Sequence, residues 1–363
     1  MKKQLKVIEL FGGIGACSSA LTRLGIDYKI VDYVEIDKYA VKSFNAIHGT
    51  NFEPQDICKW DKDVEVDLIM HGSPCQDFSL AGKQAGGDKD SGTRSSLMYE
   101  TIRIVEKLKP KYVIWENVKN LLSKKHRHNF DAYLETMEQL GYTNYYQVLN
   151  AKDYGIPQNR ERVFTVSILG NEKYEFPKGE ENNNKIDRLF NFSARQDCRV
   201  VYDENGLSPT LVAGMGAGGG KVPMFIEKPF EFPPKQLLKL KLKDMLEDEV
   251  DDYYYNVCPS MIKALEEGKV KNVTNLDYCN TLTTKQARWN NAGMIIDKKG
   301  LRYLSGIETW RLMGFDDEDY KKASLVCPLS QLYKQAGNSI VVNVLEAIFD
   351  NLLQEYKCKK GEK

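Results

Sequence analysis

Short apolar runs alternate with amphipathic helical patterns over the first 170 residues, and this alternation restricts the fold more than any other feature of the sequence. A repeated strand–helix order builds a sheet whose parallel strands carry helices on both faces, so we expect an α/β, doubly wound and mostly parallel sheet. The predicted strands are Lys6–Phe11, Ile30–Glu35, Val66–His71, Tyr112–Glu116, Tyr145–Leu149 and Arg162–Ile168, and the predicted helices are Cys17–Leu24, Lys38–Ala46, Ser96–Leu108 and Phe130–Leu140.

The pattern changes after Gly170. Residues 171–198 are polar and rich in asparagine, residues 206–223 are rich in glycine, and Lys235–Leu246 predicts a basic amphipathic helix. A later apolar pattern, Ile340–Glu355, predicts a helix long enough to pack back on the first domain. A chain of 363 residues exceeds what one hydrophobic core usually spans. We therefore predict a first domain over 1–170, a smaller loop-rich domain over 171–320, and a returning C-terminal segment over 321–363.

Bulk composition neither requires nor excludes a nucleic-acid partner. Lys plus Arg and Asp plus Glu both number 51, so a DNA-binding face would have to arise by segregation of the basic residues. The first apolar run is interrupted by Glu9, which argues against a signal peptide, and no stretch approaches the roughly 18 apolar residues of a membrane span. The eight cysteines include no CxxC pair. We expect reduced thiols in a cytoplasmic protein that uses no membrane.

A glycine-rich loop, Phe11-Gly12-Gly13-Ile14-Gly15, follows the first predicted strand. Such a loop lets the backbone turn tightly and approach a ligand, although a purely structural turn explains the loop alone equally well. Glu35 ends the second predicted strand, 20 residues after Gly15, where doubly wound folds place a carboxylate on ribose hydroxyls. No phosphate-binding lysine follows the loop. The pattern favours a ligand that has a ribose and no pyrophosphate, and S-adenosylmethionine fits.

Cys75 lies just beyond the third predicted strand, in the turn His71-Gly72-Ser73-Pro74-Cys75-Gln76. An isolated cysteine is usually a buried structural residue, but glycine and proline here fix an exposed turn at the ligand-binding edge of the sheet. An exposed thiol of this kind acts as a nucleophile when a neighbour lowers its pKa. Glu116, which ends the next predicted strand, is a candidate proton donor beside the thiol; the alternative is a surface residue that caps the following helix.

Two arginines, Arg160 and Arg162, enter the last predicted strand on the same side, because alternate residues of an extended segment share a face. One could meet a substrate oxygen while the other makes a supporting ion pair, although a plain surface pair has the same spacing. His126 and His128 form an HxH pattern with no third ligand nearby in the sequence, which indicates a basic loop and no metal site.

Seven sequence blocks occur in the order that is typical of one enzyme family. They are FGGIG at Phe11, VEID at Val34, GSPCQDFS at Gly72, ENV at Glu116, QNRER at Gln158, RYLSGIETWRLMGF at Arg302 and YKQAGNSIVVNVL at Tyr333. The chain therefore resembles, over nearly its whole length, the DNA cytosine-5-methyltransferases of bacterial restriction–modification systems and their phages. The resemblance implies a Rossmann-like, S-adenosylmethionine-dependent methyltransferase domain over 1–170 and a target-recognition domain over 171–320.

The activity implied by the resemblance is methyl transfer from S-adenosylmethionine to carbon 5 of a cytosine flipped out of double-stranded DNA, within a specific short sequence. Cys75 would add to ring carbon 6 and Glu116 would hold ring nitrogen 3. Arg162 would lie near the cytosine carbonyl oxygen with Arg160 in support, but the assignment of the two arginines stays open. A monomer without a metal is expected.

The resemblance also implies which residues bind the cofactor and the DNA. The expected cofactor contacts are Phe11, Gly13, Gly15, Glu35, Ile36, Asp56, Ile57, Pro74, Asn338 and Ser339; Asp56 is placed to accept from an adenine amino group but by itself is more typical of a solvated loop acid. The expected DNA contacts are Ser79, Lys83, Gln84 and Arg94 in the polar loop after the nucleophile, and Thr210, Thr281 and Arg288 in the recognition region.

Three rival activities use the same kind of scaffold. An RNA cytosine methyltransferase of this family would carry a Cys-Phe-Thr tripeptide in its recognition region, and the sequence has none. An inactive DNA-binding regulator would not need intact Cys75, Glu116 and Arg162. A small-molecule methyltransferase would not need the long second domain. These features favour the DNA enzyme.

Overall fold

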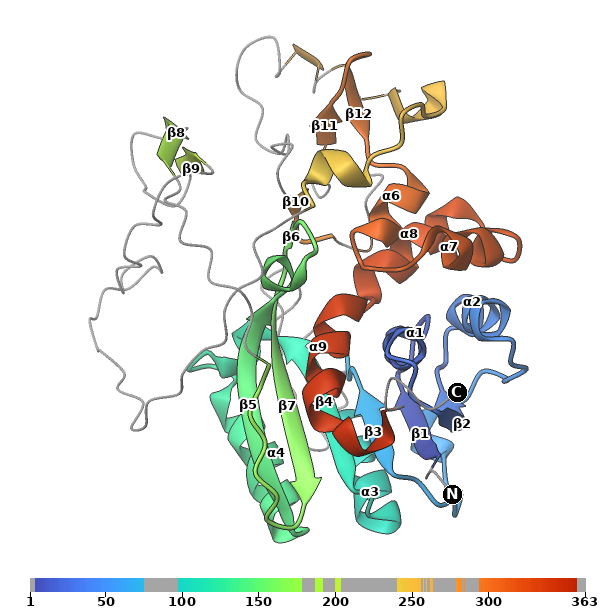
Figure 1. Ribbon diagram of the computed structural model, residues 1–363, viewed down its shortest axis with the longest axis vertical. Helices are drawn as coiled ribbons and strands as arrows, with labels where there is room; N and C mark the ends of the chain where they lie inside the picture. The colour runs from blue at the N-terminus through green and yellow to red at the C-terminus, as the bar shows by residue number, and fades with distance from the viewer. Residues whose placement is uncertain are drawn as a thin grey trace.

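The computed structural model describes residues 4–74, 97–177, 187–191, 200–203, 240–255, 257, 259, 262–263, 279–282, 284 and 294–357. Its centre is a six-stranded sheet in the order β2-β1-β3-β4-β7-β5 (Figure 1). The strands β2, β1, β3 and β4 are parallel neighbours, whereas β7 runs antiparallel to both β4 and β5. The expected mostly parallel sheet is confirmed. Its strands are β1 (Leu5–Leu10), β2 (Tyr28–Val34), β3 (Leu68–His71), β4 (Tyr112–Val118), β5 (Tyr142–Asn150) and β7 (Glu161–Leu169).

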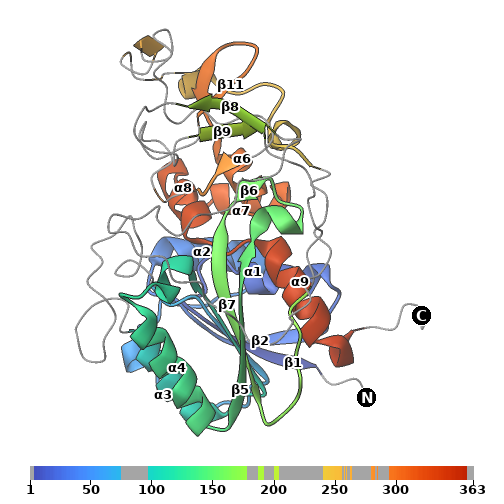
Figure 2. The same ribbon diagram turned by 90° about the vertical axis from the view of Figure 1, so that its left-hand side faces the viewer.

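Helices cover both faces of this sheet (Figure 2). Side chains alternate along a strand, so Leu68 and Met70 of β3 face one core while Ile69 faces the other. The first core is closed by α1 (Ala16–Arg23) and α9 (Val342–Leu352), and the second by α3 (Met98–Leu108) and α4 (Arg127–Gln139). The remaining N-terminal helix, α2 (Lys38–His48), packs against a C-terminal helix, α7 (Asp317–Ser324).

The C-terminal part of the chain returns to the first domain. The apolar pattern predicted over Ile340–Glu355 forms α9 together with a short turn, η8 (Gln354–Tyr356). Because α1 and α9 lie against each other, the last helix completes a core that the first residues began. The helices that precede α9 are α6 (Gly306–Arg311), α7 and α8 (Leu329–Asn338), and buried side chains of α6 and α8 join the same core.

The described part of the recognition region consists of short elements. They are β8 (Asp187–Asn191), β9 (Val200–Asp203), η6 (Leu242–Met245), η7 (Asp252–Tyr255), β10 (Cys279–Asn280), β11 (Met294–Ile296) and β12 (Leu301–Tyr303). The first domain also has four short elements: η1 (Ile57–Lys59), η3 (Lys119–Leu122), η4 (Ala151–Tyr154) and β6 (Gln158–Asn159). The last of them, β6, pairs with β10 in parallel.

The amphipathic helix predicted over Lys235–Leu246 is wrong where it is described. Only one tight turn, η6, forms over its end, and residues 235–239 lie outside the described residues. The Asp244 carboxylate accepts from the Lys241 backbone N–H at 2.7 Å and so starts the turn locally. Leu242 and Met245, three residues apart, are both buried, which a single turn already achieves.

A buried charge cluster fixes the last part of the recognition region to α6. The Arg302 guanidinium is 1% exposed and pairs with Asp297 at 2.5 Å and Glu308 at 2.8 Å. Ser305 caps α6 by accepting from the Glu308 backbone N–H, while the Glu308 carboxylate accepts from the Ser305 N–H. The buried arginine therefore has carboxylates on two sides, which offsets its desolvation.

Candidate active site

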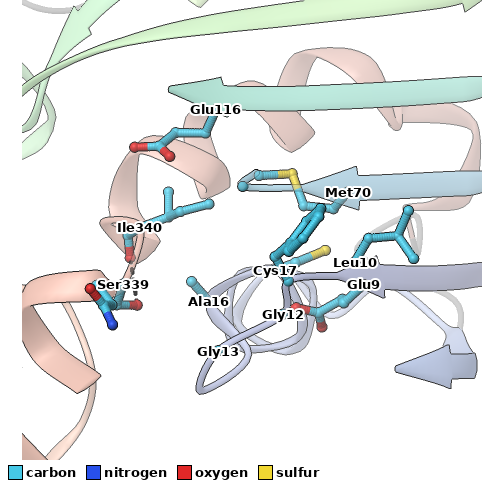
Figure 3. Close-up of a pocket in the computed structure, with 13 residues that line it drawn as sticks. Glu9, Leu10, Gly12, Gly13, Ala16, Cys17, Met70, Glu116, Ser339 and Ile340 are labelled. Atoms are coloured by element: carbon cyan, nitrogen blue, oxygen red, sulfur yellow. Dashed lines mark hydrogen bonds between the residues drawn. The ribbon is translucent and has the colours of Figure 1, made fainter. Parts of the chain in front are cut away.

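A pocket lies at the carboxyl edge of the parallel strands, where doubly wound folds bind their ligands (Figure 3). Segments that follow β1 and β3 meet there with β4 and with the chain just after α8. The lining residues are Glu9, Leu10, Phe11, Gly12, Gly13, Ala16, Cys17, Met70, Gly72, Glu116, Asn338, Ser339 and Ile340. The pocket thus brings together parts of the first strand, the third and fourth strands and the C-terminal segment.

The glycine loop forms the β1 wall of this pocket, and its glycines are required by geometry. Gly13 and Gly15 have φ of 55° and 83°, a conformation that side chains disfavour. A Cβ at Gly12 would lie 2.6 Å from the Tyr33 ring, and a Cβ at Gly15 would lie 2.2 Å from His48 Nε2. The Tyr33 hydroxyl donates to the Gly13 carbonyl at 2.6 Å. The close contacts of Tyr33 and His48 with the loop leave no room for side chains, so backbone atoms of the loop form part of the pocket surface.

Glu35 is held against the glycine loop, as its position after the second strand predicted. Its carboxylate accepts from the Gly13 backbone N–H at 3.2 Å and from the Asp37 N–H at 2.8 Å. Burial raises the pKa of this carboxyl, although the two backbone donors act in the opposite direction. Ile36 beside it is 70% exposed, which is unusual for a large aliphatic side chain and leaves an apolar surface at this end of the site.

Asp56 and Ile57 lie next to Glu35, because the Gln55 backbone N–H donates to the Glu35 carbonyl at 2.8 Å. One Asp56 oxygen accepts from the Cys58 N–H at 3.0 Å and caps η1. The Ile57 side chain is buried in the core shared by β1 and α3. These two residues are adjacent to the glycine loop region but do not line the pocket itself.

The C-terminal contacts expected from Asn338 and Ser339 both reach the pocket. The helix before them is fixed to α2: the Gln335 amide donates to the Tyr39 carbonyl at 3.0 Å, and Lys334 pairs with Asp37 at 2.5 Å. Ile340 follows and also lines the pocket. A segment some 300 residues away in sequence from the glycine loop is therefore held beside the same pocket.

Glu9 is a buried carboxyl that interrupts the apolar pattern of β1. It lines the pocket and accepts hydrogen bonds from the backbone N–H and hydroxyl of Ser18, in the first turn of α1. Burial raises its pKa to about 7, and the same burial raises the pKa of the neighbouring Cys17 thiol. A carboxyl that is half ionised near neutral pH thus lies beside the glycine loop.

The turn that leads to Cys75 is anchored up to Pro74. Ser73 is buried, and its hydroxyl accepts from the Trp115 indole Nε1–H at 2.9 Å. The Asn117 side-chain amide donates to the Ser73 carbonyl at 3.4 Å. Two side chains of β4 therefore fix the approach to the predicted nucleophile, and Cys75 itself lies outside the described residues.

Glu116 and Arg162 face each other across neighbouring strands. Arg162 Nε lies 3.1 Å from Glu116 Oε1, and the Glu116 side chain is only 11% exposed. Burial raises the pKa of the Glu116 carboxyl, while Arg162 and then Arg160 act to lower it. Glu116 is therefore a buried pocket residue and not a surface helix cap, and burial is the main cause of its raised pKa.

Arg160 has a different environment from Arg162. Its guanidinium is buried and donates to three backbone carbonyls: Leu282 at 3.3 Å, Gly337 at 3.3 Å and Ser339 at 2.7 Å. These carbonyls belong to the recognition region and to the segment that lines the pocket. Arg160 thus joins chain segments, while the ion pair expected of one arginine is made by Arg162.

Most of the expected DNA contacts lie outside the described residues: Ser79, Lys83, Gln84, Arg94, Thr210 and Arg288. Thr281 is described, and its hydroxyl donates to the Asn159 carbonyl at 2.7 Å, beside the short β6–β10 pairing. Its side-chain donor is engaged within the protein.

Among the described residues, no group of three or more His, Cys, Asp or Glu side chains is arranged to hold a metal ion. His126 is buried at the start of α4, and His128 is exposed in its first turn. None of the helices in the described part of the chain is both long and apolar enough to cross a membrane.

Sequence reasoning missed several pocket residues. A charged residue inside an apolar strand was the available signal for Glu9. Ile340 follows two predicted contacts, Asn338 and Ser339, directly in the sequence. Gly12 and Gly72 belong to the two motifs already recognised, whereas Leu10, Ala16, Cys17 and Met70 line the pocket with small or apolar groups that carry no chemical signature.

Comparison with known proteins agrees with this arrangement. A family model described as C-5 cytosine-specific DNA methylase matches residues 5–354. The chain is 32% identical to the type II methyltransferase M2.ScrFI of Lactococcus lactis subsp. cremoris, with 96% of this chain and 99% of that protein covered. It is 28% identical to the orphan methyltransferase M.SPRI of Bacillus phage SPR, with 99% and 100% covered.

Solved structures show the same fold. The Dnmt2 methyltransferase of S. pombe superposes with a TM-score of 0.65 at 18% identity and covers 97% of this chain and 99% of its own. The Entamoeba histolytica methyltransferase EhMeth gives a TM-score of 0.66 at 17% identity, with 97% and 99% covered.

Proposed function

The chain belongs to the C-5 cytosine-specific DNA methylase family, and on this premise we propose that it transfers a methyl group from S-adenosylmethionine to a flipped-out cytosine of double-stranded DNA, with Cys75 as the nucleophile. The observation that carries the proposal is that one pocket is lined by both the glycine loop of β1 and Glu116 of β4. A cofactor on the loop and a base on Glu116 would share this space, as direct methyl transfer requires.

The glycine loop and the segments that follow β2 and α2 fit S-adenosylmethionine. Glu35 provides a fixed carboxylate for ribose hydroxyls, and Ile36 provides an exposed apolar side chain for the adenine ring. Asp56 retains a second carboxylate oxygen beyond its cap bond for the adenine amino group. The rest of the cofactor would be enclosed from two sides, by Phe11, Gly13, Gly15 and Pro74 on one and by Asn338 and Ser339 on the other. The bound cofactor supplies an electrophilic methyl group on a sulfonium.

The β4 wall fits the cytosine. The Cys75 thiolate would add to ring carbon 6, which places negative charge on the ring. Because its raised pKa favours the protonated form, the Glu116 carboxyl can donate to ring nitrogen 3 and stabilise that charge. Arg162, paired with Glu116, has the position from which to meet the carbonyl oxygen, while Arg160 positions the backbone of Ser339.

After carbon 5 takes the methyl group, the former sulfonium would leave as a neutral thioether. Water or hydroxide in the site would then accept the proton from carbon 5, and departure of the Cys75 thiolate would restore the aromatic ring and free the enzyme. A base inside the duplex cannot reach this pocket, so the cytosine must leave the stack. We assign selection of the target sequence to residues 171–320, and the chemistry to residues 1–170 with the returning segment 321–363.

The test is methylation of a mixed-sequence duplex with labelled S-adenosylmethionine, followed by bisulfite sequencing, with wild type and Cys75→Ser compared. We expect label in cytosine within one short motif, and its loss in the variant. Trapping on DNA that contains 5-fluorocytosine gives an independent readout, because an adduct accumulates only if the thiol adds to the ring. A folded wild-type protein that labels RNA and no DNA would overturn the proposed substrate.

A further inference from the structure

Strand β2 carries a buried aspartate, Asp32, that does not line the pocket and has no part in the proposed chemistry. The strand is irregular at this point. Along β1, Val7 is paired with Ile30, but the next residue, Ile8, is paired with Asp32, so Val31 is an extra residue. An extra residue of this kind bends a strand and redirects the side chains beside it. The irregularity therefore places Asp32 where regular pairing would have placed Val31.

The Asp32 carboxylate binds three side chains of one later segment, residues 55–62. One of its oxygens accepts from the Gln55 side-chain amide at 2.8 Å. The other accepts from the Trp60 indole Nε1–H at 2.7 Å and lies 2.8 Å from Lys62 Nζ. Both oxygens are thus used to hold the same segment against β2.

This carboxylate keeps its charge although it is buried. Burial acts to raise the pKa of Asp32, but the hydrogen bonds from Lys62, Trp60 and Gln55 outweigh it and leave the pKa below its ordinary value. A buried anion that lost these donors would be left unpaired, which is strongly unfavourable. The charge of Asp32 therefore resists any movement of the segment away from β2.

Helix α3 holds the opposite side of the segment. Arg103 Nη2 donates to the carbonyls of Ile57 at 3.1 Å and Trp60 at 2.9 Å. The same guanidinium is oriented by Glu100, which accepts from Arg103 Nε at 2.8 Å. The segment is thus fixed between two charged groups, with its side chains on Asp32 and its carbonyls on Arg103.

Between these anchors lies Asp56, the carboxylate expected to accept from the adenine amino group. The segment begins beside the proposed ribose carboxylate, because the Gln55 backbone N–H donates to the Glu35 carbonyl at 2.8 Å. Asp56 follows Gln55 directly and precedes Trp60 by four residues. Both residues that Asp32 binds through neutral donors therefore flank the turn that carries Asp56.

We propose that Asp32 is a positioning residue that makes the cofactor site selective for adenine. It would act only through the segment: by holding Gln55 and Trp60 it fixes the place of the Asp56 carboxylate. A carboxylate fixed there accepts from an amino group, but it has no donor to meet when a purine carries an oxo group at that position. This inference rests on the proposed function, and deepens it at the cofactor end of the site.

The experiment compares two ligands by calorimetric titration of the full chain. They are S-adenosylhomocysteine and S-inosylhomocysteine, in which an oxo group replaces the adenine amino group. The main variant is Asp32→Asn, which keeps the shape of the side chain. Its amide N–H2 would face donors on either side, because Gln55 meets one carboxylate oxygen while Trp60 and Lys62 meet the other.

A second variant and a control accompany it. Gln55→Met removes one anchor at a half-buried position and keeps the length of the side chain and the backbone N–H, so folding should not depend on it. The control is Asp67→Asn. Asp67 is also a buried aspartate of the sheet and accepts from the Lys6 backbone N–H at 3.0 Å. It precedes β3 and therefore lies at the edge opposite the pocket.

Wild type should prefer S-adenosylhomocysteine by about tenfold or more, the value of one charge-assisted hydrogen bond. Asp32→Asn should weaken binding of S-adenosylhomocysteine about tenfold and that of S-inosylhomocysteine much less, so that the preference largely disappears. Gln55→Met should lower the preference about threefold, and the control should keep it. With saturating S-adenosylmethionine, kcat of Asp32→Asn should stay within about twofold of wild type, because only cofactor binding is altered.

The preference separates positioning from simple structural support, since a residue that only supports the fold weakens both ligands equally. Wild-type preference in both Asp32→Asn and Gln55→Met would overturn the inference, even if their affinities fell. Equal binding of the two ligands by wild type would overturn it as well.

The two proposals fail separately. If wild type transfers no methyl group to DNA, the proposed function fails. If wild type methylates DNA and the variants keep its preference for adenine, only the role assigned to Asp32 is wrong.

Discussion

The two walls of the pocket differ in the atoms that they present: mainly backbone on the β1 wall and a charged side chain on the β4 wall. The β1 wall is mainly backbone, because neighbouring side chains leave no space for a Cβ at Gly12 or Gly15. Glu35, beside this wall, is fixed by backbone N–H groups. On the β4 wall the Glu116 side chain lines the pocket, and it is paired with Arg162 of the neighbouring strand β7. The first wall should therefore be sensitive to added volume and the second to altered charge.

The largest effect should come from the β4 wall. Glu116→Gln removes the acidic proton that would be donated to ring nitrogen 3, so we expect kcat to fall about 10²- to 10⁴-fold. The free energy of unfolding should change by about 1 kcal/mol or less, because the amide keeps the shape of the side chain. Methyl-transfer kinetics and urea unfolding measure the two effects. Glu106→Gln, exposed on α3, is the control; equal kinetics in the two variants would contradict the assigned role.

The second effect should come from the β1 wall and should appear in stability. Gly15→Ala places a Cβ against His48 and Phe44 in a left-handed backbone, so unfolding should lose roughly 2–5 kcal/mol. Gly13→Ala is the matched variant, because its φ of 55° is also left-handed but nothing lies within 4 Å of the added Cβ. It should lose only about 1–2 kcal/mol. Similar losses in urea unfolding would show that packing does not shape the loop.

The third effect concerns Glu9, the acidic residue on the backbone wall. Its pKa is raised from 4.5 to about 7, so the folded protein binds a proton that the unfolded chain has released. Stability should therefore fall as pH rises from 4.5 to 7, by about 3 kcal/mol from this group. Glu9→Gln cannot titrate and should lack this part of the dependence. Urea unfolding of both proteins across this pH range measures the difference, and parallel curves would exclude the raised pKa.

The smallest effect should come from Ile36, beside the glycine loop, where cofactor affinity and protein stability should respond differently to substitution. Ile36→Ser removes an apolar side chain that is 70% exposed, so unfolding should change by less than about 0.5 kcal/mol. If adenine packs on this side chain, the Kd for S-adenosylmethionine should rise about tenfold, since about 1–1.5 kcal/mol of apolar contact is lost. Leu325→Ser, 86% exposed after α7, should change neither quantity. Calorimetric titration measures the affinities.

The sheet and its helices were predictable because their signals are local. Apolar periodicity marks each strand and helix of the first 170 residues, and the structure has all of them with ends shifted by a few residues. The C-terminal helix was also correct. The prediction of a helix over Lys235–Leu246 was wrong for its described residues. A single turn there is closed by a local carboxylate and already buries both of its apolar side chains.

In the candidate site, too, some features were predictable from the sequence and others were not. The contact of Glu35 with the glycine loop was predictable because strand ends of a parallel sheet share an edge, whereas the spacing of Arg160 and Arg162 fitted a plain surface pair as well. The roles of the two arginines could not be separated from sequence, because both lie at the start of one strand. Only their surroundings distinguish them: carbonyls around Arg160, and a carboxylate beside Arg162.

The sequence by itself determined the order of the elements, the family and the chemical groups available, since periodicity, glycine spacing and motif order are properties of the chain. Tertiary structure decided which of those groups meet. Residues 9, 116 and 339 are far apart along the chain, yet they line one pocket because β1 and β4 belong to one sheet and α8 is bonded to α2. Burial there raises the pKa of Glu9 and of Glu116, and burial is created by packing between distant segments, which no local pattern encodes.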